Sequence, residues 1–190
     1  MRLHRVLTSV AALAVAGALV TGCDSAGGNS ESAPTTTSAL TPLGLEPEAP
    51  ASYQPCTAVT QDIRDQLQLN ATSEPYPSDY DGPGGLKWRG CTFVRVNGYA
   101  VGIRTTNITL QFVRENWSNG LRDFTIDGRN ATSVHKSDEH GCTVNVEMRG
   151  GSLDFNLDNP VSNRDTGHLD SCQLATEVAE LVVPTLPAGA

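Results

Sequence analysis

The stretch that decides the fold is GCTVNVEMRGGSLDFNLD, which occupies residues 141–158. Apolar side chains take every second position on both sides of Gly150-Gly151. They are Cys142, Val144 and Val146 before the glycines, and Leu153, Phe155 and Leu157 after them. Alternation with a period of two is typical of strands with one buried face, and paired glycines suit a tight turn. The stretch therefore predicts a β-hairpin that buries one face.

Further strands are expected upstream of this hairpin, at residues 87–96, 99–105, 124–126 and 131–134. Asn97-Gly98 separates the first two and is a strong hairpin signal, while Asp127-Gly128 separates the last two. Residues 70–85 are rich in Pro, Gly, Ser and Asp, so we expect a loop there.

Helices are expected at both ends of this region. The first begins at Thr57 or Thr60, either of which can cap a helix. Its apolar face carries Val59, Ile63 and Leu67. The last helix begins at Asp170 and Gln173, which resemble a capping box, and Pro184 stops it. Its apolar residues are Leu174, Val178, Leu181 and Val182. Residues 109–117 suit a short helix. The predicted fold class is α+β, with an antiparallel sheet of about five to six strands packed against N- and C-terminal helices.

Residues 1–22 are typical of a bacterial lipoprotein signal peptide. Arg2 and Arg5 supply positive charge, and residues 7–20 form an apolar run too short to span a bilayer comfortably. The run ends in Val20-Thr21-Gly22-Cys23, which resembles the lipobox cleaved by the lipoprotein signal peptidase. We expect Cys23 to carry a diacylglycerol that holds the protein on the extracytoplasmic face of the cell membrane.

Between this anchor and the folded part lies a segment of low complexity. Residues 23–52 are expected to form the lipidated cysteine and a flexible linker, since Ser, Thr, Ala, Gly and Pro dominate them. Residues 53–190 are expected to form a single α+β domain, long enough for one hydrophobic core.

Four cysteines remain once Cys23 is set aside: Cys56, Cys91, Cys142 and Cys172. An even number in an exported domain indicates two disulfides, and four cysteines allow three pairings. We prefer Cys56 with Cys91 and Cys142 with Cys172, because these loops would have similar sizes. Zinc is the alternative, since His140 lies near Cys142 and His168 near Cys172. Neither spacing matches the usual zinc ligands, so we expect no metal and no cofactor.

The charge balance argues against one class of partner. The chain has 13 Lys and Arg against 21 Asp and Glu, a formal net charge of -8. A general nucleic-acid binder needs a basic surface to displace phosphate counterions, so we expect no nucleic-acid partner.

Candidate catalytic and metal-binding motifs are incomplete. Residues 79–82 resemble the start of a calcium loop, but Gly90 stands where the bidentate glutamate would be. Residues 82–87 lack the spacing of a phosphate-binding loop. His135 and His140 flank acidic residues, and His168 lies near Asp165 and Asp170, yet solvated loop residues explain these patterns. We therefore expect no catalytic residues.

The large aromatic side chains in the middle of the domain are Trp88, Tyr99, Phe112 and Trp117. They are expected either in the core or along a groove between sheet and helix for an apolar or glycan ligand. Tyr76 and Tyr80, in the predicted loop, are better placed for surface contact.

Several features in a fixed order carry a family resemblance. They are the lipobox, the linker, Pro55-Cys56, Cys91-Thr92-Phe93, residues 127–131, Cys142 with its alternating valines, and residues 172–175. The chain resembles the actinobacterial lipoproteins of domain-of-unknown-function family 3558, although Gln54 and Phe93 depart from the usual Asp and Trp. The resemblance implies a cell-envelope location, an α+β domain and four structural cysteines. It brings no assigned activity.

The expected function is therefore a non-enzymatic, accessory or sensor-like binding module for another envelope protein or a small amphiphile. The alternative is an envelope hydrolase or lipid-handling enzyme that uses His135 or His168. A purely structural role at the cell wall is the third possibility.

Overall fold

The computed structural model describes residues 44–70, 73–138 and 140–190. The expected signal peptide, Cys23 and most of the expected linker lie outside these residues. Within them the chain forms eight strands, four α-helices and two 3-10 helices. In chain order the elements are α1 (Pro55–Ala58), α2 (Gln61–Leu67), β1 (Tyr76–Pro77), β2 (Tyr80–Asp81), η1 (Pro83–Gly85), β3 (Lys87–Val94), β4 (Ala100–Thr106), α3 (Leu110–Asn116), β5 (Arg122–Ile126), β6 (Arg129–His135), β7 (Gly141–Met148), β8 (Gly151–Asp158), α4 (Ser171–Val182) and η2 (Val183–Thr185).

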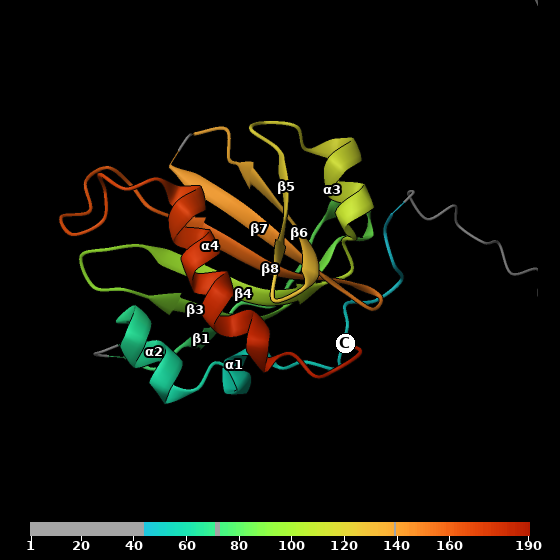
Figure 1. Cartoon of the computed structure of the whole chain (residues 1–190), viewed down its shortest axis with the longest axis horizontal. Coiled ribbons are helices and arrows are strands. Elements are labelled where there is room, and N and C mark those ends of the chain that lie inside the picture. Colours follow the sequence, from blue (N-terminus) through green and yellow to red (C-terminus); the bar gives the residue numbers. More distant parts are fainter. Residues whose placement is uncertain (1–43, 71–72, 139) are drawn as a thin grey trace, which may run out of the picture. The chain divides into compact units, whose positions relative to one another are not determined.

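The strands form one antiparallel sheet in the order β1-β3-β4-β8-β7-β6-β5, and β2 also pairs with β3 (Figure 1). The predicted α+β class and antiparallel sheet are confirmed. The hairpin β7–β8 lies in the interior of the sheet, where Val144 faces Phe155 across the pair. Both side chains are fully buried.

The expected number of strands was too low. The segment that we expected to be a loop contains β1 and β2, which pair with β3 through Tyr76, Pro77, Tyr80 and Asp81. These two-residue strands are held by backbone pairing, and their side chains are exposed. An exposed strand of this length leaves no alternation of apolar residues by which the sequence could reveal it.

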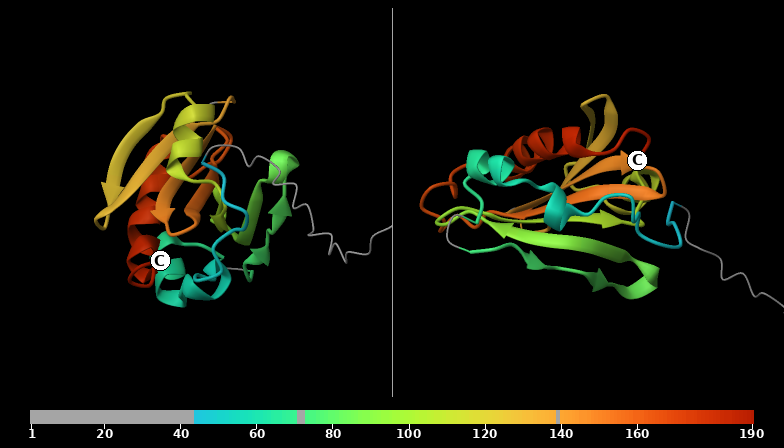
Figure 2. Two further views of the ribbon diagram at one scale, coloured as in Figure 1. Left: turned by 90° about the vertical axis from the view of Figure 1, so that its right-hand side faces the viewer. Right: turned by 90° about the horizontal axis from the view of Figure 1, so that it is seen from below.

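One face of the sheet carries the main core. Val144 and Phe155 lie on the strands that α4 covers, and Phe93 and Ile103 lie on the strands that α1 contacts. All four side chains belong to one core, to which α4 and α2 also contribute. Figure 2 shows these three helices on one side of the sheet. Two disulfides, Cys56–Cys91 and Cys142–Cys172, link α1 to β3 and α4 to β7. These are the pairs that we preferred.

The expected helices form, with two differences. The N-terminal helix is divided into α1 and α2, because Val59 has extended backbone angles and ends α1. Thr60 then caps α2, since its side chain accepts a hydrogen bond from the Ile63 amide. Asp170 caps α4 in the same way, while Leu181 of α4 is partly exposed instead of buried. Among the described residues, no helix is long and apolar enough to cross a membrane.

The opposite face of the sheet is largely polar, and α3 packs over it at β6 and β7. A small second core forms there around Ile108, Val113 and Val134. Leu45 joins this core and pairs with Ile108, although we expected it to belong to the flexible linker. The amide of Glu46 also donates to the carbonyl of Asn107, so the packed part of the chain begins before Tyr53.

The two glycines of the central turn differ in their surroundings, which allows a matched test. A Cβ at Gly151 would lie 2.0 Å from the carbonyl oxygen of Thr106, whereas a Cβ at Gly150 would meet nothing within 4 Å. Both have positive φ angles. We expect Gly150→Ala to cost about 1 kcal/mol through backbone strain alone. Gly151→Ala should cost about 3 kcal/mol, because the backbone of β4 must move. Urea unfolding measures both, and equal losses would contradict this packing.

Candidate functional site

Two cavities lie on opposite faces of the sheet, and His135 lines both of them. The first, here called the polar-face cavity, has a volume of about 580 Å³. The second, the helix-face cavity, has about 550 Å³ and lies between α4 and the strands β5 and β6. Because neighbouring residues of a strand point to opposite faces, the two cavities offer different chemistry.

The polar-face cavity combines two aromatic rings with many hydrogen-bonding groups. Trp88 comes from β3, and Trp117 follows α3 directly. The polar residues that line the cavity are Asn116, Ser118, Asn119, His135, Lys136, Ser137, Asp138, Thr143, Asp154 and Asn156. Phe112 packs edge-on against Trp117, with 6.0 Å between ring centroids, and holds that ring in place. A cavity of this composition can bind a molecule with one apolar side and several hydroxyl or amide groups.

A buried ion pair lies at the inner wall of this cavity. The Arg104 Nη2 atom lies 2.8 Å from the Asp154 Oδ2 atom, and only 3% of the Asp154 side chain is exposed. The guanidinium also lies over Trp88, 5.8 Å from the ring centroid. Gly102 leaves room for it, since a Cβ there would meet Arg104 Nε at 3.2 Å. Burial raises the pKa of Asp154 above its ordinary value, although the charges of Arg104 and Lys136 oppose the shift.

The ion pair belongs to a polar row that crosses the sheet. Arg104, Asp154, Asn145 and Thr132 are register partners on β4, β8, β7 and β6. Asp154, Asn145 and Thr132 are buried. Within the described part of the chain, Arg104 Nε, Asn145 Oδ1 and Thr132 Oγ1 have no hydrogen-bond partner. Buried polar atoms without partners are costly to the fold, and of the four residues in this row Asp154 lines the polar-face cavity.

Lys136 is fixed at another wall of the polar-face cavity. Its Nζ atom donates to Asn156 Oδ1 at 2.8 Å and to Asp158 Oδ1 at 2.6 Å. Both acceptors lie on β8, on the same face of the sheet as Asp154. The ammonium group is therefore neutralised locally, and the cavity has no large excess of either charge.

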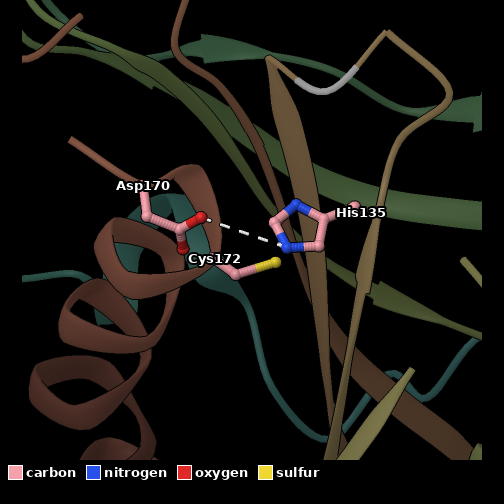
Figure 3. A group of neighbouring side chains, drawn as sticks. All are labelled: His135, Asp170 and Cys172. Atoms are coloured by element: carbon pink, nitrogen blue, oxygen red, sulfur yellow. Dashed lines mark ion pairs between the residues drawn. The ribbon is translucent and has the colours of Figure 1, made fainter. Parts of the chain in front are cut away.

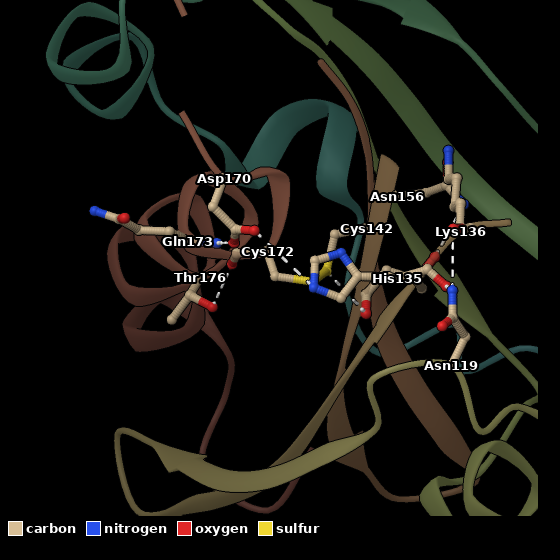
Figure 4. The surroundings of a disulfide bond; sticks show 10 residues. Asn119, His135, Lys136, Cys142, Asn156, Asp170, Cys172, Gln173 and Thr176 are labelled. Atoms are coloured by element: carbon tan, nitrogen blue, oxygen red, sulfur yellow. Dashed lines mark hydrogen bonds and ion pairs between the residues drawn. A yellow bond between two sulfur atoms is a disulfide. The ribbon is translucent and has the colours of Figure 1, made fainter. Parts of the chain in front are cut away.

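Among the residues that the structure describes, one group of potential metal ligands is found, and it lies in the helix-face cavity. His135, Asp170 and Cys172 each offer one ligand atom, and these atoms lie within 4.8 Å of one another (Figure 3). His135 Nε2 is 4.0 Å from Asp170 Oδ2. Gly120 makes room for the imidazole, because a Cβ there would lie 2.8 Å from His135 Cδ2. Figure 4 shows the ring beside the disulfide that joins Cys172 to Cys142.

The structure rearranges the histidine pairs that the sequence suggested. His135 lies next to Asp170, with 4.0 Å between its Nε2 atom and Asp170 Oδ2, although the sequence paired Asp170 with His168. His168 is exposed, and its expected neighbour Asp170 faces His135. His140 is also exposed, and its own amide donates to Asp138. Among the described residues, neither His140 nor His168 belongs to a group of three potential metal ligands.

The acidic residues of the suggested calcium loop have structural partners. Asp79 accepts a hydrogen bond from the Gly90 amide at 2.9 Å, and Asp81 forms an ion pair with Arg89 at 2.6 Å. Both contacts fasten the segment of β1 and β2 to β3. Lys87, which ends the suggested phosphate-binding motif, forms an ion pair with Glu48.

The aromatic residues divide between core and cavity. Tyr99 is buried in the main core, whereas Trp88 and Trp117 line the polar-face cavity. Tyr80 stacks on Trp88, with 5.6 Å between ring centroids, and Tyr76 is exposed.

Sequence reasoning missed Arg104, Asp154 and Asn156. A signal was present, because polar residues alternate with the apolar ones through both strands of the central hairpin. Such residues normally face solvent, so nothing in the alternation indicated that Asp154 would be buried and would line a cavity.

Loss of the acceptor on one side of the buried pair should destabilise the fold. Asp154→Ala leaves the Arg104 guanidinium without its hydrogen-bond acceptor at a buried site, and we expect a loss of about 3 kcal/mol in the free energy of unfolding. The double variant Arg104→Met/Asp154→Leu removes both polar groups and should recover most of this loss. Urea unfolding of the three proteins measures the difference. A double variant less stable than Asp154→Ala would contradict the assignment of the cost to an unpaired guanidinium.

The same pair predicts a pH dependence with a defined sign. The raised pKa of Asp154 means that the folded protein holds this proton more tightly than the unfolded chain. Its contribution to stability therefore falls as pH rises from about 4, the ordinary aspartate value, through the raised pKa. We expect the wild type to lose stability relative to Arg104→Met/Asp154→Leu across this window. Urea unfolding at a series of pH values measures the difference, and a flat or rising difference would contradict the shift.

Comparison with known proteins gives one family. The family described as "Protein of unknown function (DUF3558)" matches residues 18–185, which is most of the chain. No curated protein and no solved structure gives a significant match. The match includes all four disulfide cysteines and every strand of the sheet. The chain therefore belongs to the DUF3558 family of proteins of unknown function.

Proposed function

We propose that the protein is a lipid-anchored binding module of the bacterial cell envelope, which takes a small amphiphilic ligand into the polar-face cavity. The anchor is supported by the lipobox at residues 20–23, which resembles that of actinobacterial lipoproteins. The binding role is supported by the composition of the cavity.

One observation carries the proposal: Trp88 and Trp117 line the same cavity as the buried carboxylate of Asp154 and the amide of Asn156. Aromatic rings provide flat apolar surface, and fixed amides and carboxylates orient hydroxyl groups. A ligand that joins an apolar part to neutral polar groups, such as a glycolipid fragment, satisfies both. A strongly anionic ligand would lack a cationic partner, since Lys136 and Arg104 already have counter-charges.

The enzymatic alternative has weaker support. His135 and Asp170 share the helix-face cavity, so an imidazole base with a nearby carboxylate is present. Cys172 lies beside them, but its sulfur is in a disulfide and is no nucleophile in that state. We rank this alternative second.

The two tryptophans of the chain both line the polar-face cavity, so tryptophan fluorescence reports on this site alone. We expect an alkyl glucoside, added below its micelle concentration to residues 24–190, to change the emission saturably. Asn156→Ala should weaken this binding about tenfold, because a buried hydrogen bond to the ligand is lost. Asn130→Ala, which removes an exposed amide that bonds to Glu147, is the matched control and should bind like the wild type. An unchanged emission, or equal affinity in both variants, would count against the cavity as the ligand site.

The anchor has its own test. In a bacterial host that is fed radiolabelled palmitate, the full chain should incorporate the label, because the acyl chains of the lipid anchor derive from fatty acid. Cys23→Ser removes the thiol that accepts the lipid and should abolish the labelling. Cys56→Ser, which leaves the lipobox intact, should be labelled like the wild type. Labelling of Cys23→Ser at the wild-type level would contradict lipidation at this residue.

A further inference from the structure

We propose that reduction of the Cys142–Cys172 disulfide converts the helix-face cavity into a site for one divalent metal ion of the zinc type, held by His135, Cys142, Cys172 and Asp170. This inference goes beyond the binding role of the polar-face cavity and does not depend on it. It assigns a chemistry to the helix-face cavity, which lies on the other face of the sheet.

The four groups converge from three elements. His135 on β6 and Cys142 on β7 are register partners, so their side chains leave the same face of the sheet side by side. Asp170 and Cys172 lie at the beginning of α4, which the disulfide holds against β7. Figure 3 shows the carboxylate, the imidazole and the sulfur of Cys172 facing one another. Cys142 completes the set, since its sulfur is bonded to that of Cys172.

Distances between the groups suit a small tetrahedral site. In a tetrahedral zinc site with two thiolates, neighbouring ligand atoms lie about 3.4–3.8 Å apart, as follows from zinc–ligand bonds of about 2.0–2.3 Å. The ligand atoms of His135, Asp170 and Cys172 already lie within 4.8 Å of one another, and His135 Nε2 is 4.0 Å from Asp170 Oδ2. The carboxylate is held in place, because its other oxygen accepts from the Gln173 amide at 2.8 Å. Two movements are still needed: the two sulfur atoms must separate, and the ligand atoms, of which the Cys142 sulfur lies outside the group within 4.8 Å, must close around the ion.

Reduction of the disulfide allows the two sulfur atoms to separate, and a dithiol can provide the electrons and protons that this step requires. A dithiol reductant transfers two electrons and two protons to the sulfur–sulfur bond and becomes a disulfide itself. The bond between Cys142 and Cys172 breaks, and two thiols form. Each thiol releases its proton when its sulfur binds the metal. Cys172 lines the helix-face cavity and is partly exposed, so both reductant and metal have access from solvent.

Charge around the opened site favours a cation. Asp170 would lie beside two thiols, and Glu177 and Glu180 of α4 line the same cavity. Among the residues given for the lining of this cavity, Arg122 is the one with a permanent positive charge. His135 would bind the metal as a neutral imidazole. The helix N-terminus supports a thiolate at Cys172, but the nearby carboxylate opposes it. A bound divalent cation removes this conflict and favours both anions at once.

The proposed metal ion would give the fold a second means of holding α4 against the sheet. In the oxidised protein a covalent bond fastens the first turn of α4 to β7. In the reduced protein the metal would connect the same two elements, with β6 added through His135. The ion would therefore preserve the main core, to which α4 contributes Leu174, Val178 and Val182, after the covalent link is lost.

Cobalt(II) provides the test, because thiolate-bound tetrahedral cobalt has characteristic charge-transfer and visible absorption bands. Residues 24–190, reduced with a phosphine that does not bind cobalt strongly, should bind one equivalent and show these bands. Zinc should displace the cobalt and erase them. The oxidised protein, which lacks thiolates, should show no bands at the same concentration. Far-ultraviolet circular dichroism should show that the reduced protein with metal is folded.

Variants assign the ligands. His135→Ala should weaken cobalt binding at least about tenfold, because one of four ligands is lost. Asp170→Asn keeps an oxygen for the helix cap, removes the charge, and should also weaken binding. His168→Ala, which removes an exposed histidine of the preceding loop, is the matched control and should leave affinity unchanged. Cys142→Ser/Cys172→Ser should abolish the bands although Cys56 and Cys91 remain.

Three results would overturn the proposal. The first is a reduced, folded protein without cobalt bands. The second is equal cobalt affinity of His135→Ala and the wild type. Such a result would mean that cobalt binds to cysteines of an unfolded chain and not to the folded site. The third is persistence of the bands in Cys142→Ser/Cys172→Ser, which would assign them to the other cysteine pair. The ligand role of the polar-face cavity is tested by tryptophan emission and not by cobalt absorption, so failure of one proposal leaves the other unaffected.

Discussion

Pairing of β7 with β8 divides the molecule into two chemical environments, and the other elements follow this division. Their register places Val144 beside Phe155 on one face and Asn145 beside Asp154 on the other. The apolar face receives α4, and the polar face receives α3. A shift of one residue in this pairing would exchange the two faces and leave the disulfide from β7 to α4 on the wrong side. The helix-face and polar-face cavities thus arise from a single alternation.

Most antiparallel sheets with one apolar face expose the other face to water. Here part of the polar face is covered, because α3, Trp117 and the segment around Leu45 pack over it. The polar row beneath them keeps the Arg104–Asp154 pair, together with atoms that have no partner within the described residues. A protein that needed this face only for stability would be served better by apolar residues. The binding role that we propose would account for polar groups at this position, because Asp154 of the row lines the polar-face cavity.

The parts of the fold that the sequence predicts are those with local signals. The central hairpin follows from its alternation, and α2 and α4 follow from the caps Thr60 and Asp170. The two disulfides follow from an even number of cysteines in a domain that we expected to be exported. The parts that it does not predict depend on contacts between distant residues. Neither Leu45 against Ile108 nor His135 against Asp170 leaves a periodic pattern, because each joins segments far apart in the chain. The polar-face cavity was predicted only in part. Trp88 and Trp117 were candidates for either the core or a groove, but the sequence led to no prediction for their polar neighbours Asp154 and Asn156.

With the N-terminal tether that we propose, the position of the first disulfide would also have a mechanical meaning. Tension applied there would first pull away the segment that contains Leu45, which is held by one buried side chain and a few hydrogen bonds. The load would next reach Tyr53, which is buried and hydrogen-bonded to Thr185. It would then reach Cys56, and the covalent bond to Cys91 would pass it directly into β3. Helix α2 and residues 73–90 lie inside the loop closed by this bond, so they would carry little of the force. The disulfide would therefore limit how far the chain can be drawn out and would protect the core from forces on the tether.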